Sequence, residues 1–230
     1  MASSGQPVKL GRPLDWLVIA DHSDAMGFID DLRAGASNVL AFEEGRRWYE
    51  GLQAGGEASV AAALDRRGTG GFDLLAEAAE YVKSGRVNSI RFSTRPDTID
   101  RQRLDLIKNF HVATIELGVQ SMDERVLSTT KRGHSALETE KAIERLKELK
   151  YEIGVQLMVG LPGDTPERSI ASAQRVASLK PDFIRIYPTV VLAGSPLADW
   201  YRKGDYVPLS MESAVSQTKK LYLLFKNENI

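Results

Sequence analysis

Apolar residues follow two spacings from residue 73 onward, and the two alternate along the chain. Short apolar runs typical of buried strands occupy residues 88–94, 113–119, 152–159 and 182–188. Helical spacing occupies the intervening residues, at 73–84, 99–110, 122–127, 136–150, from Pro166, at 196–203 and from about Met211. Strand and helix alternating with short connections predict an α/β fold. Its parallel sheet has right-handed crossovers and is either open or closed into a barrel.

Local signals support these helix boundaries. Ser135 followed by Glu138 three residues later is a capping box, which predicts a helix start at residue 136. Pro166 suits the first turn of a helix, where its missing N–H costs little. The chain ends on a helix with apolar Leu221, Leu224 and Phe225, which we expect to need a partner surface, as in a truncated barrel.

Residues 1–72 have a different pattern. A strand at 16–20, a helix at 25–34 and a second strand at 38–42 suggest a β-α-β start. The turn after the first strand has neither a G-x-G-x-x-G pattern nor a Walker A lysine, so no nucleotide site is predicted. That turn contains Asp21, His22 and Asp24. Residues of these types more often stabilise a turn or cap a helix than bind a metal, so we expect no metal site there.

Composition narrows the function. The net charge of −1 gives no overall attraction to nucleic acid or anionic membrane, although a local basic face remains compatible with it. No apolar run reaches membrane-spanning length and the N-terminus has no signal-peptide core, so we expect a cytoplasmic protein without membrane contact. The chain contains no cysteine, which excludes disulfides, thiolate nucleophiles and thiolate-held zinc or iron–sulfur clusters.

Polar residues stand where the predicted strands end. Gln120 and Gln156 are amides within strands that are otherwise apolar, and a buried amide needs hydrogen-bond partners. They form either a self-satisfied network or part of a site for a polar ligand. Arg132 offers a planar fork for a carboxylate or phosphate, although a loop arginine is more often solvated. We expect His134, next to Arg132 in the same loop, to have a structural or helix-capping role and not to act as a catalytic base.

Three motifs carry a resemblance to a known family. They are L-G-V-Q-S-M-D-E-R-V-L at 117–127, R-G-H-S at 132–135 and V-Q-L-M-V-G-L-P-G-D-T at 155–165. Together they resemble the radical S-adenosylmethionine superfamily, in its branches related to the Elongator catalytic subunit and to oxygen-independent coproporphyrinogen oxidase. The resemblance covers residues 73–230, whereas residues 1–72 match nothing in the family, so the expected domain boundary is at residue 72.

The resemblance implies a partial (β/α) barrel of the radical S-adenosylmethionine type, truncated at both ends. In that family a [4Fe–4S] cluster cleaves S-adenosylmethionine to a radical that abstracts hydrogen from a substrate. By position, the cofactor-binding residues that the family implies here are Ser93, Arg95, Gln120, Arg132, Gln156 and the loop from Gly160 to Gly163. Relatives in the Elongator branch act on tRNA, which makes tRNA, or another small substrate, the implied partner besides S-adenosylmethionine.

The missing cysteines are the departure from the family pattern. We therefore expect a radical S-adenosylmethionine core that is incomplete or inactive as written, with no catalytic residue and no metal ligand assigned. The alternative is a non-catalytic α/β binding or interaction module. A barrel hydrolase or lyase is the third hypothesis, and it would need a carboxylate–histidine or metal constellation.

Overall fold

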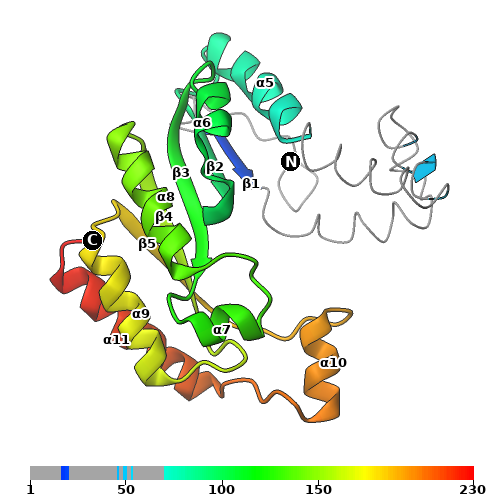
Figure 1. The fold of residues 1–230 in the computed structure, drawn as a ribbon, viewed down its shortest axis with the longest axis vertical. Helices are drawn as coiled ribbons and strands as arrows, with labels where there is room; N and C mark the ends of the chain where they lie inside the picture. The colour runs from blue at the N-terminus through cyan, green and yellow to red at the C-terminus, as the bar shows by residue number, and fades with distance from the viewer. Residues whose placement is uncertain (1–16, 21–45, 47–48, 51–52, 54–69) are drawn as a thin grey trace, which may run out of the picture. The chain divides into compact units, whose positions relative to one another are not determined.

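The computed structural model describes residues 17–20, 46, 49–50, 53 and 70–230 (Figure 1). The helix predicted at 25–34, the strand at 38–42 and the turn at 21–24 lie outside the described residues. The chain divides into two compact units, Met1–Ser93 with Ile107–Ala113, and Thr94–Leu106 with Thr114–Ile230. Each unit is taken by itself below.

The first unit contains a pair of parallel strands. β1 (Leu17–Ala20) pairs with β2 (Ile90–Thr94) in a register that places Leu17 opposite Ile90. Helix α5 (Gly70–Lys83) precedes β2, so the helix predicted at 73–84 is confirmed and begins three residues earlier. Burial does not simply alternate along β2, because Arg91 and Ser93 are buried as well as Ile90.

The connection from β2 to β3 holds two short helices. They are the 3₁₀ helix η2 (Pro96–Thr98) and α6 (Arg101–Ile107). α6 is shorter than the predicted helix 99–110, because the Asp100 carboxylate accepts a hydrogen bond from the Arg103 backbone N–H (2.8 Å) and sets the start of the helix after Asp100.

The second unit is built on three parallel strands, which confirms the predicted α/β class. β3 (Val112–Gln120), β4 (Glu152–Val159) and β5 (Phe183–Pro188) pair in that order. The crossovers carry α7 (Glu124–Thr129), α8 (Ala136–Glu148) and α9 (Pro166–Ser178). The capping box at Ser135 and Glu138 is formed as predicted.

Two further helices complete this unit. α10 (Pro196–Lys203) has the predicted bounds, and α11 (Met211–Asn227) packs against α9 and β5 (Figure 1). Leu221 and Phe225 are almost fully buried there, so other elements of this chain supply the partner surface that these residues were expected to need.

The two faces of the second unit's sheet differ in polarity. Successive strand residues point to opposite faces. One face is apolar and buried, and helices α8, α9 and α11 pack on β4; its residues are Ile115, Leu117, Val119, Ile153, Val155, Leu157 and Val159. The other face carries Glu116, Gln120 and Gln156, which are also buried. Within the described part of the chain, no helix is long and apolar enough to cross a membrane.

Candidate functional site

Gln120, the last residue of β3, has an unusual conformation. Its φ of 67° lies in the left-handed region, which costs a residue with a side chain about 1–2 kcal/mol. The register between β3 and β4 shifts just before it, between Leu117 and Gln120. The side chain is only 6% exposed, and among the described residues its Oε1 has no hydrogen-bond partner. A strained backbone with a buried, unsatisfied amide oxygen is a feature often found at functional sites, which makes Gln120 a candidate site residue.

Gln120 lines a cavity at the ends of β3 and β4, which we call the strand-end cavity. Its volume is about 440 Å³, within the range of small-ligand pockets. The lining residues are Gln120, Thr129, Thr130, Lys131, Arg132, Met158, Leu161, Pro162, Ser195, Pro196, Leu197 and Trp200. The cavity therefore joins an amide and two cationic side chains with an apolar wall that includes an indole ring.

Arg132 approaches the cavity beside β3. Its Nη2 donates a hydrogen bond to the Gly118 carbonyl at 3.1 Å. A Cβ atom at residue 118 would lie 3.1 Å from the Gln120 Nε2 and 3.6 Å from the Arg132 Nη2. Glycine at 118 thus lets the guanidinium and the amide come close together over the strand.

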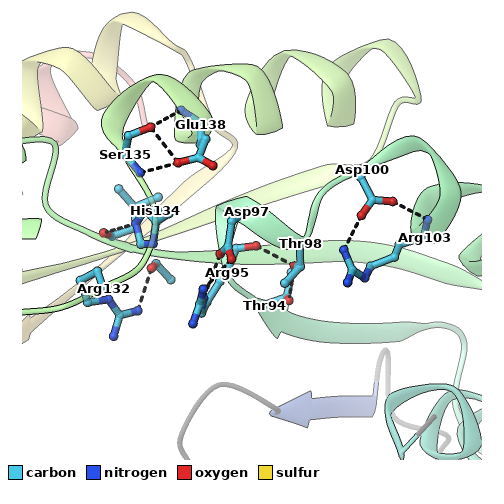
Figure 2. A network of polar contacts seen from close by, with 12 residues as sticks. Thr94, Arg95, Asp97, Thr98, Asp100, Arg103, Arg132, His134, Ser135 and Glu138 are labelled. Atoms are coloured by element: carbon cyan, nitrogen blue, oxygen red, sulfur yellow. Dashed lines mark hydrogen bonds and ion pairs between the residues drawn. The ribbon is translucent and has the colours of Figure 1, made fainter. Parts of the chain in front are cut away.

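A second network holds the turn that carries Arg132 (Figure 2). Arg95 donates to both carboxylate oxygens of Asp97, from Nε at 2.8 Å and from Nη2 at 2.5 Å. Its Nη2 lies 3.1 Å from the position that a Cβ on Gly133 would occupy. The next residue, His134, is 7% exposed and its Nε2 lies 3.2 Å from the Val119 carbonyl oxygen.

Charge and burial set the protonation states in this network. Burial lowers the pKa of His134 and outweighs the bond to the Val119 carbonyl, which acts in the opposite direction. Burial alone would raise the pKa of Asp97, but the hydrogen bonds and charge of Arg95 outweigh it, so that the Asp97 pKa is lowered. Near neutral pH the network thus holds a carboxylate, a guanidinium and an uncharged imidazole.

The loop after β4 forms part of the cavity wall and is held from both sides. Asp164 accepts hydrogen bonds from the Gly160 N–H (3.1 Å) and the Ser169 hydroxyl (2.6 Å), while the Tyr206 hydroxyl donates to the Gly160 carbonyl at 2.6 Å. Burial raises the pKa of Asp164 despite these bonds, which lower it. Gly160 has a φ of 78°, and a Cβ there would lie 2.6 Å from Leu209.

A third polar group crosses the sheet. The Glu116 carboxylate, 2% exposed, accepts a hydrogen bond from Gln156 Nε2 at 2.9 Å and lies 3.2 Å from Arg185 Nε. The pKa of the Arg185 guanidinium is raised, mainly by a hydrogen bond with Tyr187 and also by the negative charge of Glu116. The Arg185 side chain remains 42% exposed beside Tyr187, itself 40% exposed.

The structure brings together some of the residues predicted from sequence. Gln120 and Arg132 line the strand-end cavity, and so do Leu161 and Pro162, which lie between Gly160 and Gly163. A Cβ on Gly163 would lie 3.5 Å from Thr129, another lining residue.

Three other predicted residues have different surroundings. Arg95 packs against Gly133, and Gln156 bonds to Glu116. Ser93 belongs to the first unit, where it is buried in β2. Sequence reasoning missed Trp200 and Leu197, because only the path of the loop before α10 brings that helix to the cavity.

The residues do not fit an iron–sulfur cluster. The chain has no cysteine to supply thiolates. In the part of the chain that the structure describes, no group of three or more histidine, aspartate and glutamate side chains is placed to hold a metal ion. No step through such a cluster is therefore derived for this chain.

The second unit is an α/β domain with a parallel sheet and a cavity of ligand size at its strand ends, the place where domains of this class bind ligands. Comparison with protein-family models then identifies the family. The Radical SAM superfamily model matches residues 41–175, and the Radical_SAM C-terminal domain model matches residues 181–230. The chain belongs to the radical SAM superfamily. The match starts upstream of residue 73, where the recognisable motifs begin, and the domain boundary at residue 72 stays a prediction.

Curated relatives are similar over part of their length. The chain is 32% identical over 118 residues to a tRNA uridine(34) acetyltransferase of Dehalococcoides mccartyi, covering 50% of this chain and 26% of that protein. It is 28% identical over 155 residues to Elongator complex protein 3 of Dictyostelium discoideum, covering 65% and 28%. The chain thus spans about a quarter of the length of these relatives.

Solved structures support the fold. The Methanocaldococcus infernus Elp3 structure aligns with a TM-score of 0.60 and 23% identity, covering 91% of this chain and 54% of that one. Coproporphyrinogen III oxidase (HemN) from Escherichia coli aligns with a TM-score of 0.54 and 17% identity, covering 66% and 36%. The second unit therefore has the strand and helix arrangement of a radical SAM partial barrel.

Proposed function

We propose that this chain binds S-adenosylmethionine in the strand-end cavity and belongs to a protein that modifies RNA. The observation that supports this most strongly is Gln120, whose strained backbone holds a buried and unsatisfied amide oxygen at a cavity shared with Arg132. Such an arrangement costs stability in the free protein, and a ligand that satisfies the amide would recover that cost.

Each part of the cavity suits a part of this cofactor. The Arg132 guanidinium would bind the carboxylate, because charge-assisted bonds from a planar fork are strong and directional. The Gln120 amide would accept from and donate to ribose hydroxyl groups. Leu161, Pro162 and Trp200 would cover the flat apolar faces of the adenine.

The bound cofactor would bring an alkylated sulfonium that can be cleaved to a radical. In the family a reduced cluster drives that cleavage, and this chain has no thiolates to hold a cluster. The contribution that its described residues can make is to bind and orient the cofactor. The competing function is a non-catalytic module that binds other molecules without this cofactor. A chain that does not bind S-adenosylmethionine would favour that function.

The RNA part of the proposal rests on β5 and on the relatives. Arg185 and Tyr187 are exposed neighbours on one face of β5, and Glu116 holds the guanidinium in place. An arginine beside an aromatic ring is suited to phosphates and stacked bases. Relatives named as tRNA uridine(34) acetyltransferases match 50–60% of the chain, so tRNA is the substrate class we propose, with a cytoplasmic site of action.

Titration with S-adenosylmethionine, monitored by calorimetry or by intrinsic tryptophan fluorescence, tests the cofactor part. We expect saturable binding at one site per chain, and about 10- to 100-fold weaker binding in Arg132→Ala, since a charged hydrogen bond contributes about 1.5–3 kcal/mol. Arg103→Ala is the matched control, because Arg103 is exposed and pairs only with Asp100 among the contacts described. Equal affinities of Arg132→Ala and the unmodified chain would contradict the proposal.

A further inference from the structure

Arg132 enters the strand-end cavity from a turn, not from a strand or helix. The turn spans residues 131–134, between α7 and α8. Lys131 and Gly133 have φ values of 52° and 76°, so the backbone on both sides of Arg132 is in the left-handed region. Backbone hydrogen bonds from the Lys131 N–H to the Ser128 carbonyl (3.1 Å) and from the Arg132 N–H to the Leu127 carbonyl (3.0 Å) tie the start of the turn to α7. The direction of the Arg132 side chain then depends on what holds its guanidinium and the second half of the turn.

Two bonds fasten it to β3. Arg132 Nη2 donates to the Gly118 carbonyl, and His134 Nε2 is placed to donate to the Val119 carbonyl, the next along the strand. His134 is 7% exposed, so this bond is shielded from water. These two carbonyls come directly before Gln120, so the two bonds tie the turn to the end of β3.

Arg95 fastens the turn from the other side. Its bidentate pairing with Asp97 fixes the plane of the guanidinium, and Thr98 Oγ1 donates to the Arg95 carbonyl at 2.7 Å. Arg95 Nη2 lies 3.1 Å from the position that a Cβ on Gly133 would occupy, so a side chain at residue 133 would press on the guanidinium. Arg95 is not among the residues that line the cavity.

We propose that Arg95, Asp97 and His134 are positioning residues that hold the 131–134 turn and thereby aim Arg132 at a carboxylate bound in the cavity. Asp97 orients Arg95, Arg95 covers Gly133, and His134 ties the turn to β3. Arg95 thus takes the role of a support and not that of a direct cofactor contact. This inference rests on the proposed binding of S-adenosylmethionine.

Two ligands separate positioning from general damage to the cavity. S-adenosylmethionine carries the carboxylate, whereas 5′-methylthioadenosine keeps the adenosine part and lacks the amino-acid group. In Arg95→Ala, Asp97→Asn and His134→Ala we expect affinity for S-adenosylmethionine to fall about tenfold, which corresponds to about 1.4 kcal/mol, and affinity for 5′-methylthioadenosine to stay within about twofold. His134→Gln, whose amide can still donate to the Val119 carbonyl, should retain most of the affinity.

A double variant tests whether Arg95 acts through Arg132. The double variant Arg95→Ala, Arg132→Ala should bind S-adenosylmethionine no more weakly than Arg132→Ala alone. Arg95 acts only by positioning the Arg132 side chain, and that side chain is already missing in the single variant. Additive losses, an equal fall for both ligands, or unchanged affinity in all three positioning variants would each overturn the inference. If the unmodified chain binds 5′-methylthioadenosine and not S-adenosylmethionine, both the inference and the proposed cofactor fail; if it binds both, only the variants decide.

Discussion

Gln120 combines two unfavourable features, a left-handed backbone and a buried amide oxygen without a partner among the described residues. Under the proposed function, a ligand that satisfies the amide offsets the cost of this conformation. The same residue is the last of β3 and lies next to the turn carrying Arg132, so one strand end sets the polar part of the cavity.

Replacing this residue should separate stability from binding. In Gln120→Gly the left-handed backbone is relaxed and the unsatisfied oxygen removed, so we expect the free energy of unfolding to stay level or rise by up to about 1 kcal/mol. Affinity for S-adenosylmethionine should fall at the same time. Denaturant unfolding and calorimetry measure the two quantities. A loss of more than about 2 kcal/mol of stability would show that Gln120 is a packing residue instead.

Asp97 should make stability depend on pH in acid. Its pKa in the folded protein lies below the ordinary value of 3.8, so the folded state binds this proton less tightly than the unfolded chain. The stabilisation is therefore fully present above pH 3.8 and lost as the pH falls through the lowered pKa. Unfolding midpoints of the unmodified chain and Asp97→Asn, compared from pH 6 to pH 3, should converge toward the acid end. A constant difference between them would contradict the assignment.

The residues of the site were only partly predictable from the sequence. Gln120 and Arg132 stand in the motifs that resemble the family, and the structure places both on one cavity. Arg95 was implied as a cofactor contact by its position in the family, but it packs against Gly133, because its pairing with Asp97 is a local contact that this position does not encode. Trp200 carried no signal, since its approach depends on a tertiary path.

At the scale of single elements, α8 begins at a complete capping box. Ser135 accepts from the Glu138 backbone N–H at 3.1 Å, and the Glu138 carboxylate accepts from the Ser135 N–H at 2.7 Å. Ser135→Ala removes the cap, so we expect a loss of about 1 kcal/mol in the free energy of unfolding. Ser178→Ala is the control, because that exposed hydroxyl bonds only to the Arg175 carbonyl at the far end of α9. Equal effects of the two substitutions would contradict the capping role.

The contact between β4 and β5 requires a glycine in mid-strand. A Cβ on Gly154 would lie 2.3 Å from the ring of Phe183 and 2.7 Å from the Glu116 side chain. Gly154→Ala should therefore lower the free energy of unfolding by about 1–3 kcal/mol through overpacking.

Gly194→Ala is the matched control for this substitution. That glycine has a positive φ but open space around it, so its replacement isolates backbone strain from overpacking. Urea denaturation of both variants gives the comparison, and we expect the m-values to stay unchanged. A neutral Gly154→Ala would show that the strands separate easily at this point.

Element boundaries were predictable where a local signal ends the element. β4 and α10 have the predicted limits, and α9 starts at Pro166 behind the Thr165 cap. The final helix was predicted, but its covering surface was not, because packing of α11 on α9 and β5 joins segments distant in sequence. Periodicity specifies which face of a helix is apolar and leaves open what covers that face.

At the scale of the whole chain, the fold of the family is present but the cysteine ligands of its iron–sulfur cluster are not. The described second unit has the fold of the superfamily and a cavity that we propose for S-adenosylmethionine, while the chain supplies no thiolate for the cluster. The match covers about a quarter of the length of the curated relatives.

The absence of cysteine leads to a prediction about iron. After anaerobic incubation with iron and sulfide and removal of unbound metal, we expect no stoichiometric iron and no absorbance near 400 nm, roughly where thiolate-held clusters absorb. Binding of S-adenosylmethionine should be the same before and after this treatment. Iron and sulfide retained at about four atoms per chain would show that other ligands hold a cluster.

The most direct test of the central claim is calorimetric titration of the chain with S-adenosylmethionine, without added iron, alongside Gln120→Ala and Arg132→Ala. We predict one saturable site in the unmodified chain and affinities at least about tenfold lower in both variants, with Arg103→Ala unchanged. No binding by the unmodified chain, or the same affinity in all four proteins, would contradict the claim that the strand-end cavity is the cofactor site.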